Sequence, residues 1–174
     1  CMSESSGAAM LMAAQLLEDA GPHKYSCIMI NLPKELSERI IAWGRQQIPN
    51  DILFVDDKGG CGREEEPHVT VKYGLHDAMP TDELKRIFAE ISPFDIELEP
   101  ISLFRNGDKT GNDVVKMSVS SPQLREFNRR VSESCECTDT FPDYNPHVTI
   151  AYVKPGTCDR LEGVSPFDDP VKMG

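Results

Sequence analysis

A seven-residue pattern that occurs twice restricts the fold of this 174-residue chain more than any other feature. Residues 67–73 read PHVTVKY and residues 146–152 read PHVTIAY, so four consecutive residues are identical and a tyrosine closes both copies. β-Branched residues are frequent in both segments, which is typical of strands. Similar signals surround the two copies, in the order strand, helix, strand, helix, strand in each half. We therefore predict an internal duplication.

Hydrophobic periodicity and turn residues locate the other elements. The remaining predicted strands cover residues 25–32, 95–104 and 113–119, with a weak extended tail over 167–174 as the last strand, and the predicted helices cover about 36–48, 81–91, 122–134 and 158–161. Pro100 is expected to mark an edge or a bulge, because proline cannot donate to a strand ladder. Ser121, followed by Pro122, is expected to cap its helix. Residues 49–66 are predicted to be irregular, either as a solvated acidic loop or as a flap beside the site.

Residues 1–22 are predicted to form a helical extension ahead of one domain over residues 23–174. Gly21 and Pro22 end the helical pattern, whose apolar positions are Met10, Ala13, Ala14 and Leu17. The apolar run has no basic residue ahead of it and is too short to span a bilayer, so neither an export signal nor a membrane anchor is expected. Within the domain, one lobe is expected over about residues 23–105 and the other over about 106–174.

Charge and cysteine content restrict the possible partners. The net charge is −11 and the pI is about 4.8, which is the wrong sign for a protein held to long nucleic acid by phosphate neutralisation. An anionic substrate is therefore expected to be small and held by a few local donors. The six cysteines lack the spacing of a disulfide framework, and Cys135 and Cys137 are too close for a standard zinc knuckle. We expect a cytoplasmic protein with reduced thiols, no metal and no cofactor.

The repeated strand carries residues suited to acid–base chemistry. Side chains alternate along a strand, so His68 and Thr70 share one face of the first copy, as His147 and Thr149 do in the second. Two halves related by a pseudo-two-fold axis would turn both pairs toward a common cleft. Cleavage of a phosphodiester needs a base for the attacking group and an acid for the leaving oxygen, and histidine can serve as either near neutral pH. The threonine hydroxyls are candidate donors to the non-bridging oxygens. Satisfied core histidines are the alternative, which the recurrence at equivalent positions disfavours.

This pair of motifs resembles the defining mark of the two-histidine (2H) phosphoesterase superfamily, which includes 2′,5′ RNA ligase-like proteins and cyclic nucleotide phosphodiesterases. The H-x-T-x motifs are His68–Val71 and His147–Ile150, and the resemblance covers about residues 24–165. It implies an α+β fold of two pseudo-symmetric lobes, with two antiparallel sheets facing a central cleft and helices outside. It also implies metal-independent hydrolysis of a phosphodiester bond in a small nucleotide. Phage proteins that destroy cyclic-oligonucleotide immune signals look similar as well.

The resemblance also points to residues that would contact the substrate. An aromatic side chain commonly stacks on the base in this superfamily, and the candidates are Tyr144, Tyr25 and Phe104. Lys72 shares a strand face with His68 and is a candidate phosphate contact, although a solvated lysine fits the sequence equally well. Ala151 takes the place of Lys72 in the second copy, so the two halves are not equivalent. The sequence does not say which histidine is the acid.

Three functions remain open at this point. A phosphodiesterase acting on a cyclic oligonucleotide, a 2′,3′-cyclic nucleotide or a 2′-5′-linked oligonucleotide is favoured, because both motifs are intact. A non-catalytic nucleotide-binding module of the same fold is the alternative. An interaction or virion-associated domain is the third hypothesis, motivated by the N-terminal extension. Neither the substrate nor the oligomeric state follows from the sequence.

Overall fold

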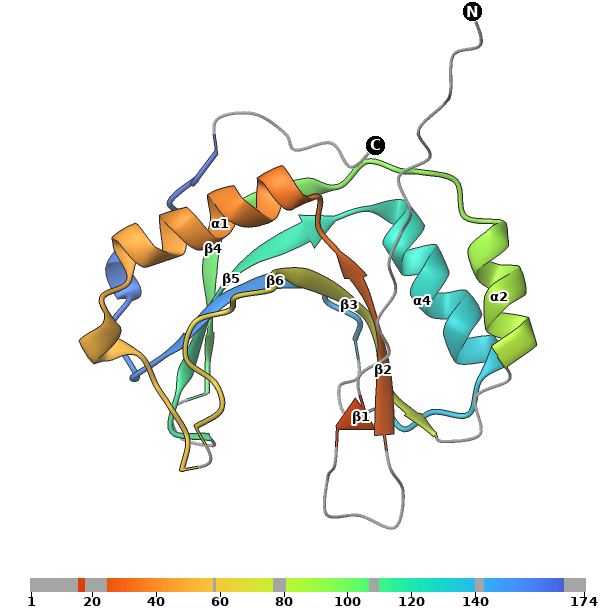
Figure 1. The fold of residues 1–174 in the computed structure, drawn as a ribbon, viewed down its shortest axis with the longest axis horizontal. Coiled ribbons are helices and arrows are strands. Elements are labelled where there is room, and N and C mark those ends of the chain that lie inside the picture. Colours follow the sequence, from red (N-terminus) through yellow and green to blue (C-terminus); the bar gives the residue numbers. More distant parts are fainter. Residues whose placement is uncertain are drawn as a thin grey trace, which may run out of the picture.

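An antiparallel sheet bends into an arch in the computed structural model, and the α-helices of the described residues lie along its convex side (Figure 1). The residues described are 16–17, 25–57, 59–76, 81–106, 110–139 and 143–167. The strands are β1 (Leu16–Leu17), β2 (Tyr25–Asn31), β3 (His68–His76), β4 (Glu97–Arg105), β5 (Asp113–Ser120) and β6 (His147–Val153). The α-helices are α1 (Lys34–Gln47), α2 (Thr81–Ala89) and α4 (Pro122–Ser134), with the 3-10 helices η1 (Asn50–Ile52) and η2 (Asp159–Leu161). The predicted α+β class with antiparallel strands is confirmed.

All six strands belong to one sheet, in the order β1-β2-β3-β6-β5-β4, and each neighbouring pair is antiparallel. The prediction of two separate sheets facing a cleft is therefore wrong. The two repeated strands, β3 and β6, lie side by side in the centre and pair at Val69 and Val148, the residue after each motif histidine. This pair joins what would otherwise be two unpaired strand edges, and unpaired edges are unfavourable.

Beyond this valine pair, β3 and β6 separate, and a loop occupies the free edge of each strand. Along β3, the amide of Thr138 donates to the carbonyl of Gly74 at 2.8 Å. Along β6, the amide of Tyr152 donates to the carbonyl of Gly62 at 2.7 Å. The acidic loop over residues 49–66 is thus hydrogen-bonded to the sheet over part of its length.

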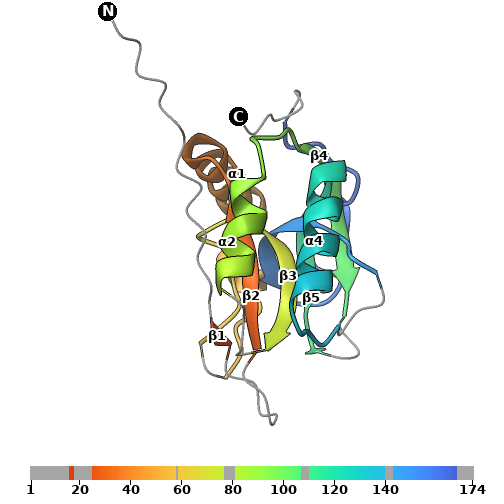
Figure 2. The same ribbon diagram turned by 90° about the vertical axis from the view of Figure 1, so that its right-hand side faces the viewer.

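The apolar faces of the strands and the helices meet in one core on the convex side. Buried side chains of β3, β6, α1 and α4 contribute to it, among them Val69, Val71, Leu75, Val148, Ile150, Ile40, Leu124 and Val131. Helices α2 and α4 lie side by side against this face (Figure 2). The rings of Phe88 and Phe127 meet edge to face between them, with centroids 5.3 Å apart. The helices leave the concave side of the arch uncovered (Figure 1).

Two predictions made from proline and serine are confirmed. The register between β4 and β5 is irregular between Leu98 and Ile101, on either side of Pro100. The Ser121 hydroxyl caps α4 by accepting from the amide of Leu124 at 3.3 Å, with proline as the first helical residue.

The structure describes two residues of the predicted N-terminal helix, Leu16 and Leu17, and neither is helical. Leu16 and Leu17 form the short strand β1, which pairs with Ser26 and Tyr25 at the edge of β2. Pairing with an otherwise open strand edge outweighs the helical spacing of the apolar residues here. The rest of the predicted helical extension lies outside the described residues.

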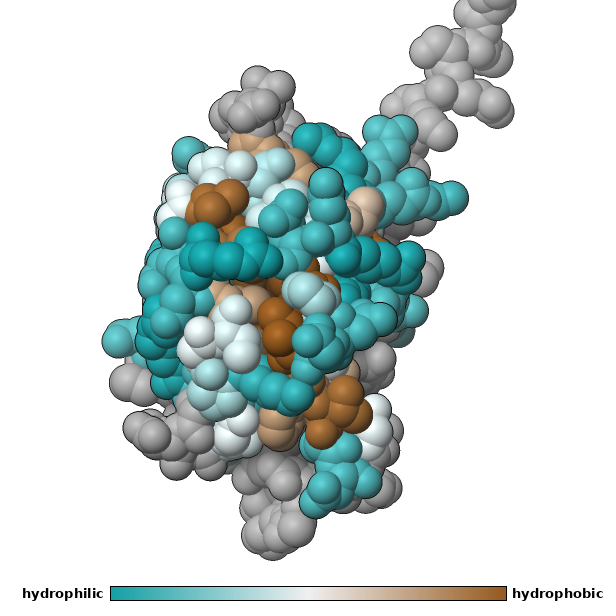
Figure 3. All heavy atoms as spheres, turned by 90° about the vertical axis from the view of Figure 1, so that its left-hand side faces the viewer, coloured by the Kyte–Doolittle hydropathy of each residue, from teal (hydrophilic) through white to brown (hydrophobic). Residues whose placement is uncertain are grey.

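The end of the molecule that carries α1 and η2 is mostly hydrophilic, with hydrophobic atoms in small groups among polar ones (Figure 3). The large apolar side chains exposed within the described segments are those of Val55 and Val164. Across these same segments, no helix is both long enough and apolar enough to cross a membrane.

Candidate active site

The four predicted catalytic residues lie on the concave face of the two central strands. The valine between histidine and threonine in each motif is buried under the helices, so alternation turns His68, Thr70, His147 and Thr149 to the opposite face. All four are half-buried. When the antiparallel register of the central valine pair is extended by one residue, His68 comes beside Thr149 and Thr70 beside His147. The one sheet therefore brings both motifs together, as two sheets were expected to do.

The same backbone hydrogen bond orients both histidines. Nδ1 of His68 lies 2.9 Å from the carbonyl oxygen of Glu66, and Nδ1 of His147 lies 2.8 Å from that of Asn145. A carbonyl can only accept, so Nδ1 is the donor in each ring and Nε2 is the nitrogen that gains or loses a proton. One proline separates the two bonded residues in both copies and fixes the backbone between them.

His147 has an environment that favours its neutral form. Burial lowers the pKa of His147, the positive charges of Lys116 and His68 lower this pKa further, and the hydrogen bond to Asn145 opposes them. The two histidines are thus close enough for their charges to interact. The ring of Phe104 meets that of His147 edge to face, with centroids 5.0 Å apart. Of the aromatic candidates whose rings the structure describes, Phe104 is in ring contact with a motif histidine.

Lys116 is a site residue that the sequence reasoning missed. It lies on β5 opposite Thr149 of β6, and it is only 6% exposed. Its Nζ donates to the hydroxyls of Ser102 at 2.9 Å and Ser118 at 3.0 Å, and lies 4.4 Å from the centroid of the Phe104 ring. Burial lowers the pKa of Lys116, and the charge of Glu99 raises it. A signal was present in the sequence, because Lys116 and Ser118 alternate with apolar residues on a predicted strand.

The other predicted substrate contacts lie in different surroundings. The Tyr144 hydroxyl donates to the backbone carbonyl of Thr70 at 3.0 Å, its ring packs against the core, and burial raises its pKa. Tyr144 thus connects the segment before β6 to β3. Lys72 is 5% exposed and forms an ion pair with Asp139 at 2.6 Å. Tyr25 begins β2 and pairs with His76, but its ring lies outside the part of the structure described.

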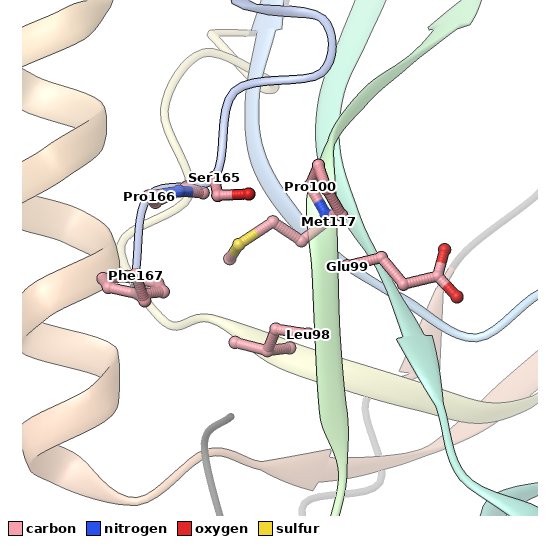
Figure 4. Close-up of a pocket in the computed structure, with 7 residues that line it drawn as sticks. All are labelled: Leu98, Glu99, Pro100, Met117, Ser165, Pro166 and Phe167. Carbon is pink, nitrogen blue, oxygen red and sulfur yellow. The ribbon is translucent and has the colours of Figure 1, made fainter. Parts of the chain in front are cut away.

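A small pocket lies on the other side of the sheet, away from the histidines (Figure 4). Its walls come from β4, β5 and the C-terminal segment: Leu98, Glu99, Pro100, Met117, Ser165, Pro166 and Phe167. Its volume of about 20 Å³ has room for about one water molecule. It is too small for a nucleotide.

Potential metal ligands do not gather within the described ranges. No group of three or more histidine, cysteine, aspartate or glutamate side chains there could hold a metal ion. Cys135 is buried and Cys137 is half-buried.

Comparison with known families agrees with the geometry of the two motifs. The sequence profile of the 2′-5′ RNA ligase superfamily matches residues 55–165, which include both histidine strands. The chain belongs to this superfamily. Membership in the 2′-5′ RNA ligase superfamily confirms the 2H phosphoesterase resemblance, over a matched range that begins later than the expected residue 24. The sequence matches none of the curated proteins compared with it.

Proposed function

We propose that this member of the 2′-5′ RNA ligase superfamily is a phosphodiesterase that hydrolyses a phosphodiester bond in a small nucleotide by two-histidine acid–base catalysis. One observation carries the proposal: His68 and His147 lie on the same face of two paired strands, each directly before one of the two paired valines. In each ring a backbone carbonyl occupies Nδ1, which leaves Nε2 for proton transfer. A phosphate placed between the rings would meet one Nε2 on each side.

The surroundings of the two rings support different roles for them. Because burial and nearby positive charge lower the pKa of His147, this ring is neutral near pH 7 and suits the base that takes a proton from the attacking hydroxyl or water. His68 then protonates the leaving oxygen as the P–O bond breaks. Proton exchange with water afterwards resets both rings.

The threonines have a matching role in this proposal. Thr70 and Thr149 lie across the strand pair from the opposite histidine, which supports a role for their hydroxyls as donors to the non-bridging oxygens. Proton transfer by two imidazoles needs no bound metal ion. The net charge of −11 favours a small substrate held by these few donors over long nucleic acid.

A substrate screen in the presence of EDTA tests the proposal. The panel contains cyclic dinucleotides, cyclic trinucleotides, 2′,3′-cyclic nucleotides and 2′-5′-linked oligoadenylate, with the His68→Ala, His147→Ala double variant as the control. We expect cleavage of at least one class by the unmodified protein and none by the control. Strong dependence on added Mn²⁺ or Zn²⁺ would contradict the mechanism. Tight binding without turnover would instead favour the non-catalytic nucleotide-binding module.

A further inference from the structure

We propose that Lys116, with the hydroxyls of Ser102 and Ser118, forms a second anion subsite that binds a phosphate next to the one being cleaved. The inference rests on the proposed function and deepens it. It predicts a substrate with at least two phosphates, such as a linear or cyclic oligonucleotide. A 2′,3′-cyclic mononucleotide, with its single phosphate, would leave this subsite empty.

The strand order separates this subsite from the cleavage position. His68 lies on β3, His147 on β6, Lys116 and Ser118 on β5 and Ser102 on β4, and these strands are neighbours in that order. Lys116 therefore lies on the side of His147 that is away from His68. Neighbouring strands are about 4.8 Å apart. The ammonium of Lys116 extends from β5 toward Ser102 on β4, so it lies roughly two strand spacings from the point midway between β3 and β6. A phosphate held there is not the phosphate between the two rings.

The charge of Lys116 is not neutralised by an ion pair. Its only ion-pair or hydrogen-bond partners within the described ranges are the two serine hydroxyls, which are uncharged. An ammonium has three N–H donors, so one remains available to a ligand. The charge of Glu99 raises the pKa of Lys116, but Glu99 forms no ion pair with it, so an anion bound beside the buried ammonium would still lower the cost of its burial.

The two halves of the sheet differ at this position. In the second motif, the strand partner of Thr149 is Lys116 on β5. In the first motif, the strand partner of Thr70 is Met29 on β2. Position 29 is buried and apolar, so it offers no ionic contact. The phosphate next to the scissile one is therefore bound on the His147 side. The bound oligonucleotide then has a defined direction across the two histidines.

A pair of matched ligands tests this subsite. One is a dinucleoside monophosphate, which has only the scissile phosphate, and the other is the trinucleoside diphosphate with the same linkage, prepared in 2′-5′ and 3′-5′ forms. We measure kcat/KM and, by calorimetry, the Kd of each ligand. The unmodified protein is expected to prefer the diphosphate, and Lys116→Met is expected to reduce this preference about 10- to 100-fold, the value of one hydrogen bond to a charged group. Lys116→Met should change the kcat/KM and the Kd of the dinucleoside monophosphate much less.

Arg105→Met is the matched control, because it removes one positive charge from β4 where the side chain is ion-paired with Asp159 and Glu162. It should leave the preference unchanged. Ser102→Ala, a smaller change, should reduce the preference in the same direction if Lys116→Met proves poorly folded. Equal losses on both ligands, or no preference in the unmodified protein, would overturn the subsite. If neither ligand is cleaved, the proposed function fails for these linkages, while the calorimetric preference still decides on the subsite.

Discussion

At the residue scale, one hydrogen bond per histidine determines which nitrogen is available for chemistry. The carbonyls of Glu66 and Asn145 each hold Nδ1 of the histidine two residues later. This bond is the same in both rings, so the difference between them comes from their neighbours, because His147 has Lys116 and Phe104 beside it. Two identical motifs can thus carry two different roles.

The pH dependence of cleavage should report this difference. On the acid side, kcat/KM should fall as His147 becomes protonated, with a midpoint below the ordinary histidine pKa of about 6.5. Lys116→Met removes a positive charge that opposes protonation, so the acid midpoint should move to higher pH, whereas Arg105→Met should not move it. The measurement is kcat/KM against pH for the three proteins. A downward shift in Lys116→Met would contradict the charge argument.

The threonines should affect rate without affecting the pH profile. Thr70→Val and Thr149→Val keep side-chain shape and strand propensity but remove a donor to the phosphate. Each is expected to lower kcat about 10- to 100-fold, the value of one charge-assisted hydrogen bond. Single-turnover cleavage at several pH values checks this. A full-rate valine variant would show that the hydroxyl does not contact the reacting phosphate.

At the element scale, local signals predicted most strands and helices, whereas their pairing could not be predicted. The proline irregularity in β4 and the serine cap of α4 depend on a few adjacent residues, so the sequence was enough. The β3–β6 pairing and the pairing of Lys116 with Thr149 of β6 join residues far apart in the chain. Strand alternation placed the histidines and threonines on one face but could not reveal which strands lie beside them. The two-sheet prediction and the omission of Lys116 have this common cause.

Gly74 tests the pairing between β3 and the segment that precedes the second motif. Its φ is +81°, and a Cβ there would lie 2.2 Å from the backbone oxygen of Thr138. Gly156, with a φ of +72° and no atom within 4 Å of a Cβ, is the matched control. Gly156→Ala should cost about 1–2 kcal/mol of unfolding free energy from its left-handed backbone alone. Gly74→Ala should cost about 1–3 kcal/mol more, because backbone must move. Urea unfolding measures both, and equal losses would contradict a tight β3 contact.

At the scale of the whole molecule, the helices and the candidate site lie on opposite sides of the sheet. The convex face carries the core, so stability depends on side chains that do not face the histidines. Substitutions of the half-buried motif histidines and threonines should therefore change activity with little loss of stability, since no buried partner is left unsatisfied. The chain as a whole is strongly acidic, and its site concentrates histidine and lysine side chains on the uncovered face.

The most direct test of the central claim compares single-turnover cleavage by the unmodified protein, His68→Ala, His147→Ala and the double variant, with melting temperature recorded for each. Each single change should slow cleavage about 10²- to 10⁴-fold, since each removes one proton-transfer group. The double variant should lose much less than the product of the two single losses, because both rings act on one transition state. Melting temperatures should stay close to that of the unmodified protein. Full cleavage by the double variant would contradict the account.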